Sequence, residues 1–168
     1  MIGPDDPYLG ETSRTITEFA KSGLAMRGGG PIVDVRDVAA VHAAVMEPGR
    51  GPRRYMITGH YVALPDLIAM LQQITGRHCR IVAMPVGLTL AFGRVADLMQ
   101  RVIPGRLPFN HEGVWITSLR AHCDDSKTVS ELGVTPRDLR VTLADTVQWL
   151  ADQGHLPAPA GAAYRSEA

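Results

Sequence analysis

Two His-Cys pairs carry the side chains in this sequence that are best suited to bind a metal. They are His78-Cys79 and His122-Cys123, the second followed directly by Asp124-Asp125. Imidazole, thiolate and carboxylate groups together can bind zinc. Neither the spacing of paired cysteine ligands nor that of paired histidine ligands is present, and neighbours on a strand point to opposite faces. We therefore expect no metal site, and we interpret these residues as half-buried cysteines and surface histidines.

The other groups with catalytic potential lack a suitable context. No serine lies in a Gly-x-Ser-x-Gly motif, and Ser22-Gly23 lies where a helix is expected to end. Asp124 and Asp125 are adjacent carboxylates of the kind used in acid–base catalysis. However, Asp125 directly precedes a helical pattern, and Asp is a favoured helix N-cap. The sequence therefore offers no catalytic residue that we can name.

The glycine run Gly28-Gly29-Gly30 does not have the pattern of a phosphate-binding turn. Such a turn has the spacing G-x-G-x-x-G between a strand and a helix, so that backbone amides can approach phosphate. Here the run is followed by Pro31 and a β-branched segment. The pattern predicts a loop or hinge instead.

The composition is that of a neutral globular domain. The chain has 168 residues, of which 45% are hydrophobic and 20% charged, with 17 basic and 17 acidic side chains. This balance argues against a nucleic-acid partner. The apolar run 81–93 is interrupted by Pro85 and is too short to span a membrane, and no signal peptide is apparent. Two cysteines fit a reducing compartment, so we expect a cytoplasmic protein.

The elements that must position any site read as short strands alternating with helices. The clearest helix covers 64–74, where apolar residues recur with helical spacing, Pro65 suits the first turn and Gly76 the position after the end. The other expected helices are 11–24, 38–46 with Asp37 as N-cap, 88–102, 126–132 with Asp125 as cap, and 139–152. The expected strands are 32–35, 53–58 and 80–84, with 115–119 extended. The pattern indicates an α/β fold with few strands.

Six segments, in this order, resemble the C-terminal half of the extended short-chain dehydrogenase/reductases. They are GPDDP (3–7), VDVRDVAAVH (33–42), RYMITG (54–59), LPDLIAMLQQITG (64–76), DSKTVSELG (125–133) and DLRVTLADTVQWL (138–150). The family includes NAD-dependent epimerase/dehydratases and dihydroflavonol-reductase-like enzymes. The resemblance implies an incomplete Rossmann-type α/β fold with few short strands and five or six helices. It assigns 1–154 to the substrate-binding C-terminal part and leaves 155–168 as a flexible tail.

In this family the N-terminal half carries the glycine-rich turn and a catalytic Tyr-x-x-x-Lys. The four tyrosines here are followed four places on by other residues: Tyr8 by Thr12, Tyr55 by Gly59, Tyr61 by Pro65 and Tyr164 by Ala168. The resemblance implies NAD or NADP as cofactor. Because the catalytic motifs are absent, we do not expect this chain to bind the cofactor alone.

The resemblance also assigns site residues. It places Gly3 and Pro4 at the nicotinamide end of the cofactor, and Tyr8, Val35 and Arg36 towards the substrate. The guanidinium of Arg36 is suited to fork onto a carboxylate or phosphate. The alternative is a surface ion pair with a neighbouring carboxylate, that of Asp34 or Asp37.

Two hypotheses follow for function. In the first, the chain is the substrate-binding portion of an NAD(P)-dependent oxidoreductase or epimerase, from a truncated reading frame, and acts on a small carbonyl or alcohol together with a Rossmann half in cis or in trans. In the second, it is a stand-alone, non-catalytic binding or interaction module derived from that family.

The resemblance also bears on stability. It implies that the expected strand 53–58 is an edge strand of the sheet in the cofactor domain. Without that sheet, the strand and the apolar helix faces beside it lack partners, so we expect the chain to be marginally stable or homo-oligomeric.

Overall fold

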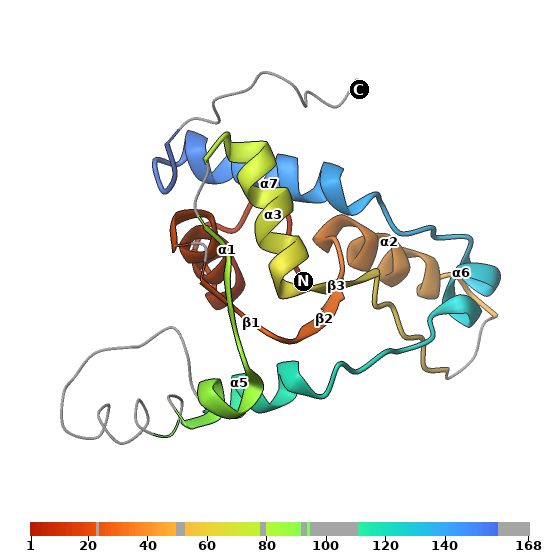
Figure 1. The fold of residues 1–168 in the computed structure, drawn as a ribbon. Helices are drawn as coiled ribbons and strands as arrows, with labels where there is room; N and C mark the ends of the chain where they lie inside the picture. Colours follow the sequence, from red (N-terminus) through yellow and green to blue (C-terminus); the bar gives the residue numbers. More distant parts are fainter. Residues whose placement is uncertain (23, 50–52, 78–79, 92–93, 95–110, 158–168) are drawn as a thin grey trace.

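The computed structural model describes residues 1–22, 24–49, 53–77, 80–91, 94 and 111–157, which form helices and short strands (Figure 1). The helices are α1 (Glu11–Ser22), α2 (Val35–Val45), α3 (Leu64–Thr75), α5 (His111–Ser118), α6 (Ser126–Leu132) and α7 (Leu139–Asp152), and residues 86–91 are also helical. The strands are β1 (Leu24–Met26), β2 (Gly29–Ile32), β3 (His60–Ala63) and β4 (Val82–Met84). The α/β class expected from the sequence is confirmed.

The four strands form two separate pairs. β1 pairs with β4 in parallel, and β2 pairs with β3 antiparallel, so that Gly29 lies opposite Ala63 and Ile32 opposite His60. A Cβ at Gly29 would lie 2.5 Å from the carbonyl oxygen of Val62, so the close approach of β3 requires glycine there. The loop expected for the whole glycine run is therefore wrong, because two of its residues belong to β2.

The hydrophobic core lies among three helices, α1, α3 and α7. Each contributes one apolar face: Ile16, Phe19 and Ala20 from α1, Leu67, Ile68 and Leu71 from α3, and Leu143, Val147 and Leu150 from α7. Burial of each large aliphatic side chain contributes about 1.5–3 kcal/mol. α3 begins with Pro65 in its first turn and ends at Gly76, whose φ of 68° is the left-handed conformation that favours glycine.

The folded part continues past α7. The amides of His155 and Leu156 donate to the carbonyl of Leu150 at 2.8 and 3.2 Å, and the side chain of Leu156 is buried in the core. Residues 158–168, most of the tail expected from the sequence, lie outside the described residues. The core thus extends at least to Leu156.

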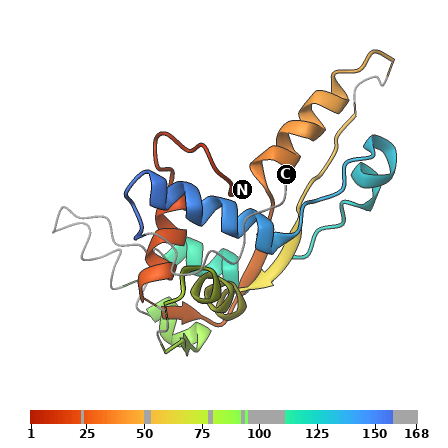
Figure 2. The ribbon, with the colours of Figure 1, turned by 90° about the horizontal axis from the view of Figure 1, so that it is seen from above.

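An arm made of α2, α6 and the segment 53–59 projects from this core (Figure 2). Thr58 donates from its amide (3.0 Å) and hydroxyl (2.9 Å) to Oδ2 of Asp125, and the hydroxyl of the buried Thr128 donates to the carbonyl of Met56. The strand expected at 53–58 is wrong: β3 begins only at His60, and these contacts to α6 occupy the preceding backbone.

Three further expectations need correction or fall outside the described residues. β2 ends at Ile32 and α2 begins at Val35, so the strand expected at 32–35 is displaced towards the glycine run. The segment 115–119, expected to be extended, is helical through Ser118 at the end of α5. Much of the helix expected at 88–102 lies outside the described residues, as does His78-Cys79. In the part of the chain that is described, no helix is long and apolar enough to cross a membrane.

Candidate functional site

The N-terminal segment lies against the residues that lead into α2. The amide of Ile2 donates to the carbonyl of Val33 at 2.9 Å, and the amide of Val35 donates to the carbonyl of Ile2 at 2.8 Å. This pairing places Gly3 against Val35, where a Cβ at position 3 would lie 2.4 Å from Cγ1 of Val35. Two of the residues assigned to the site by resemblance, Gly3 and Val35, are thus in direct contact. We refer to residues 2–4 and 33–36 as the cleft wall, after the place that the family resemblance implies for them.

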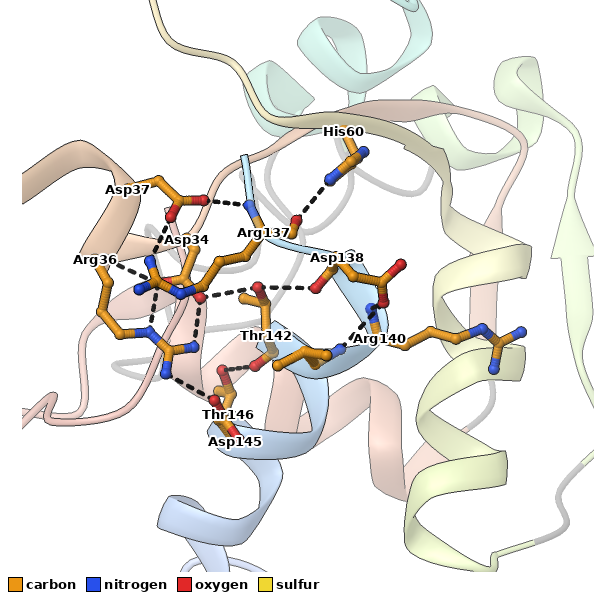
Figure 3. Close-up of polar contacts among 11 residues, drawn as sticks. Asp34, Arg36, Asp37, His60, Arg137, Asp138, Arg140, Thr142, Asp145 and Thr146 are labelled. Carbon is orange, nitrogen blue, oxygen red and sulfur yellow. Dashed lines mark hydrogen bonds and ion pairs between the residues drawn. The ribbon is translucent and has the colours of Figure 1, made fainter. Parts of the chain in front are cut away.

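Asp34 caps α2 and holds the cleft wall in place. Its Oδ1 accepts hydrogen bonds from the amide (2.8 Å) and Nε (2.9 Å) of Arg36, and its Oδ2 accepts from Nη2 of Arg36 (2.6 Å) and the hydroxyl of Thr142 (2.8 Å) (Figure 3). Burial of the Asp34 carboxyl favours its neutral form, but these hydrogen bonds outweigh burial and lower its pKa. The expected cap, Asp37, is wrong because Asp34 occupies that position.

Arg36 lies between two carboxylates. In addition to Asp34, its Nη1 contacts Oδ2 of Asp145 on α7 at 2.7 Å. The ion pair with Asp34 is the alternative that the sequence left open for Arg36, and it is present at 2.6 Å. Hydrogen bonds from Arg36 to Asp34, and then to Asp145, raise the guanidinium pKa further above its ordinary value. Arg36 therefore remains protonated and ties α2 to α7.

A second link between α2 and α7 lies beside the first. The amide of Arg137 donates to Oδ2 of Asp37 at 2.8 Å, and the guanidinium of Arg137 pairs with Oδ1 of the same buried carboxylate. A ring nitrogen of His60 lies 2.7 Å from the carbonyl of Arg137 (Figure 3). Asp37 thus joins the first turn of α2 to the residues that precede α7, and β3 contacts the same point.

Tyr8 lies away from these contacts in the loop before α1. Its side chain is 89% exposed, while Asp6 in the same loop accepts from the amide of Gly10 and the hydroxyl of Ser13, both at 2.7 Å. In the part of the chain that the structure describes, no hydrogen bond, ion pair or ring contact joins Tyr8 to Val35 or Arg36. Pro4 is half-buried beside Gly3. Of the five residues that the resemblance assigned to the site, Tyr8 is exposed to solvent. The other four, Gly3, Pro4, Val35 and Arg36, lie together.

The acidic and histidine residues weighed for catalysis have structural partners. Asp124 accepts from the amide of Ser126 at 2.9 Å, and Asp125 accepts from Thr58 and Gly59. The imidazole of His122 stacks on Tyr61 with ring centroids 4.0 Å apart. Among the described residues, no three His, Cys, Asp or Glu side chains come together in a way that could hold a metal ion.

The α7 residues that complete this network were not among those predicted from the sequence. Asp138, Thr142 and Asp145 follow one another at i, i+4 and i+7, a spacing that places them on one helix face. Asp138 caps α7 by accepting from the amide of Arg140 at 2.8 Å, and the other two contact Asp34 and Arg36. This polar stripe, beside the apolar face of the same helix, is the signal that could have identified them.

No protein-family model matches this chain. Sterol demethylase protein B from Methylococcus capsulatus is 30% identical over 158 residues, which cover 92% of this chain and 48% of that protein. A protein from Synechocystis sp., named as a candidate dihydroflavonol 4-reductase, is 31% identical over 163 residues, covering 92% of this chain and 47% of that protein. The resemblance to the C-terminal half of the extended short-chain dehydrogenase/reductases is confirmed. The chain spans about half the length of these relatives of the family.

Solved structures agree with this relationship. The crystal structure of gox2253 is 26% identical and superposes with a TM-score of 0.72, covering 92% of this chain and 48% of that one. A nucleoside-diphosphate-sugar epimerase from Pseudomonas aeruginosa is 22% identical with a TM-score of 0.68, covering 92% and 46%. This second similarity shows the fold alone. The fold of this chain is therefore part of a Rossmann-type fold found in longer proteins.

Proposed function

We propose that this chain forms the substrate-binding part of an NAD(P)-dependent oxidoreductase or epimerase of the extended short-chain dehydrogenase/reductase family, and that it does not transfer hydride by itself. One observation carries the proposal. The match to a protein named as a reductase covers 92% of this chain, yet no tyrosine of this chain is followed by a lysine four places on. The substrate would be a small carbonyl or alcohol.

The described residues do not fit the pyrophosphate of NAD or NADP. The pyrophosphate of a dinucleotide needs backbone amides at a glycine-rich turn before a helix. The glycine run of this chain instead contributes Gly29 and Gly30 to β2, paired with β3. We therefore propose that NAD or NADP is held by a Rossmann half supplied in cis or in trans, with Gly3 and Pro4 beside its nicotinamide end.

The cleft wall supports a substrate-binding role. Its backbone is fixed by the pairing of Ile2 with Val33 and Val35, and its position is fixed by the links from Asp34 and Asp37 to α7. A wall that is rigid before a ligand arrives loses little entropy on binding. Val35, half-buried against Gly3, offers the wall an apolar side chain for the carbon skeleton of a substrate.

The second candidate is a stand-alone binding module without chemistry. One observation favours it: α1, α3 and α7 form a hydrophobic core from residues of this chain alone. Such a module would bind a small molecule on the same wall. It would gain no activity when a Rossmann half is added.

The proposal is tested by titrating the ¹⁵N-labelled chain with benzylacetone, a small apolar ketone, and following the amides of the cleft wall by NMR. We expect saturable shifts at Gly3 and Val35. Val35→Thr, which replaces a methyl by a hydroxyl, should weaken binding several-fold, whereas Val38→Thr, one turn further along α2, should not. Shifts spread evenly over the surface, or equal effects of the two variants, would contradict a substrate-binding wall.

A further inference from the structure

The guanidinium of Arg36 has hydrogen-bonding capacity left over. Arginine carries five N–H donors. Nε and Nη2 donate to Asp34, and Nη1 donates to Asp145. One N–H on each terminal nitrogen therefore has no partner among the described residues. The side chain is 34% exposed, in contrast to 1% for that of Asp34. Arg36 is thus held in a fixed orientation by two carboxylates while part of it stays accessible.

The charge around this guanidinium is negative on balance. Asp34 and Asp145 both contact Arg36, and the neighbouring residues Asp37, Arg137, Asp138 and Arg140 belong to the same polar network (Figure 3). Asp37 is paired with Arg137, and the guanidinium of Arg140 points away from Arg36 and donates to Gln73 at 2.9 Å. Arg36 therefore shares its single positive charge between two carboxylates, and an approaching anion would meet a surplus of one negative charge.

We infer that Arg36 offers its two remaining N–H groups to an uncharged oxygen of the ligand, a carbonyl or a hydroxyl, and that Asp145 makes the site reject carboxylates and phosphates. The inference rests on the proposed function and narrows its substrate class. From the sequence alone, Arg36 suggested a preference for an anionic ligand. The inference reverses that preference, because Nε and Nη2, which would bind a carboxylate together, already donate to Asp34.

Asp145 is the residue through which this preference can be changed. Its side chain is 24% exposed and accepts one hydrogen bond from Arg36, so Asp145→Asn removes a charge with little loss of packing. Asp34 accepts four hydrogen bonds in a buried position and is unsuitable for the purpose. Asp152→Asn is a matched control, because Asp152 is an exposed residue at the end of the same helix that accepts from Gln148 at 2.8 Å.

The test compares two probes of nearly equal size, benzylacetone and 3-phenylpropanoate. Benzylacetone is an uncharged ketone with a methyl group in the place of one carboxylate oxygen of 3-phenylpropanoate. Dissociation constants are measured by NMR titration of the full chain, with the Nε–H signal of Arg36 as one reporter. We expect the ketone to bind about tenfold more tightly than the carboxylate, because the surplus negative charge beside Arg36 repels the carboxylate but not the ketone. Asp145→Asn should reduce this ratio by at least about threefold, and Asp152→Asn should leave it unchanged.

A second variant separates recognition from structure. Arg36→Lys keeps the positive charge but loses the planar fork, so it should weaken ketone binding several-fold. Arg140→Lys is its control, and thermal melts verify that each variant is folded. Equal ratios in the original chain and Asp145→Asn, or full ketone affinity in folded Arg36→Lys, would overturn the inference and leave the proposed function standing. If neither probe binds the original chain, both proposals fail.

Discussion

Arg36 and Asp145 lie 109 positions apart in the sequence, and Nη1 of Arg36 lies 2.7 Å from Oδ2 of Asp145. This contact joins the first turn of α2 to the middle of α7, and Thr142 joins the same two elements through Asp34. Because α7 belongs to the hydrophobic core, the cleft wall is anchored to the most buried part of the protein. The stability of the core and the shape of the wall are therefore coupled.

Asp34→Asn should destabilise the fold. The amide cannot accept all four hydrogen bonds that the carboxylate accepts, and it leaves the Arg36 charge half-paired. Removing one partner of a buried ion pair costs about 3 kcal/mol or more in the free energy of unfolding. Urea denaturation followed by circular dichroism measures the loss. Asp145→Asn, at a more exposed position, should cost about 1 kcal/mol or less, and equal losses in the two variants would contradict the buried role of Asp34.

The stability of the chain should decrease on acidification. The pKa of Asp34 is lowered in the folded state, because its hydrogen bonds outweigh burial, so Asp34 stabilises the fold above its unfolded pKa of about 3.9 and loses this contribution as the pH falls through its folded pKa. Asp6 and Asp125 also have lowered pKa values, so part of the slope should persist in Asp34→Asn. Urea midpoints measured between about pH 7 and pH 2.5 test this. Identical pH slopes with and without Asp34 would disprove its part in the effect.

Gly3→Ala should disrupt the cleft wall, because the added Cβ would lie 2.4 Å from Cγ1 of Val35. The overpacking should cost about 1–3 kcal/mol of unfolding free energy. Val35→Ala removes the clashing methyl, so a double-mutant cycle should give a coupling of about 1 kcal/mol or more. Gly30→Ala is the control, since a Cβ there has no atom within 4 Å. Additive effects at positions 3 and 35 would refute the contact.

The parts of the fold that the sequence predicted are those governed by local chemistry. α3 and α7 have an apolar period, α3 has the end signals Pro65 and Gly76, and α6 ends at Gly133. The expected bounds of all three helices agree closely with those observed. The errors arose where distant residues decide. The expected cap, Asp37, instead accepts a hydrogen bond from Arg137, which lies 100 positions away, while Asp34 caps α2.

The same distinction applies to strands and to the site. The segment 53–58 resembles a strand, but the side chains of Asp125 and Thr128 bind its backbone in place of a neighbouring strand. The pairing of Gly29 with Ala63 depends on a partner 34 positions away, which local patterns do not reveal. Arg36 was identified from family resemblance, while Asp145 was not, because its role depends on contact between α2 and α7.

The apolar surface of α5 should cause self-association. Trp115, Ile116 and Leu119 at its end are 51%, 53% and 55% exposed, and exposed apolar clusters favour contacts between protein molecules. Sedimentation velocity over a range of concentrations should show a reversible increase in mass. The double variant Trp115→Ser, Ile116→Ser should shift the chain towards monomer, whereas Met46→Ser, at an isolated exposed position, should not. A monomer at every concentration would refute this prediction.

We propose that this chain contributes the substrate wall, while another polypeptide segment binds the cofactor and supplies the catalytic Tyr-x-x-x-Lys. The most direct measurement follows the absorbance of NADH or NADPH in the presence of benzylacetone, first with the purified chain alone and then with the Rossmann half of a relative added. We expect no oxidation of the reduced cofactor by the chain alone. When the two are combined, we expect more oxidation than the Rossmann half gives by itself. Oxidation by the 168-residue chain unaided would contradict the proposal.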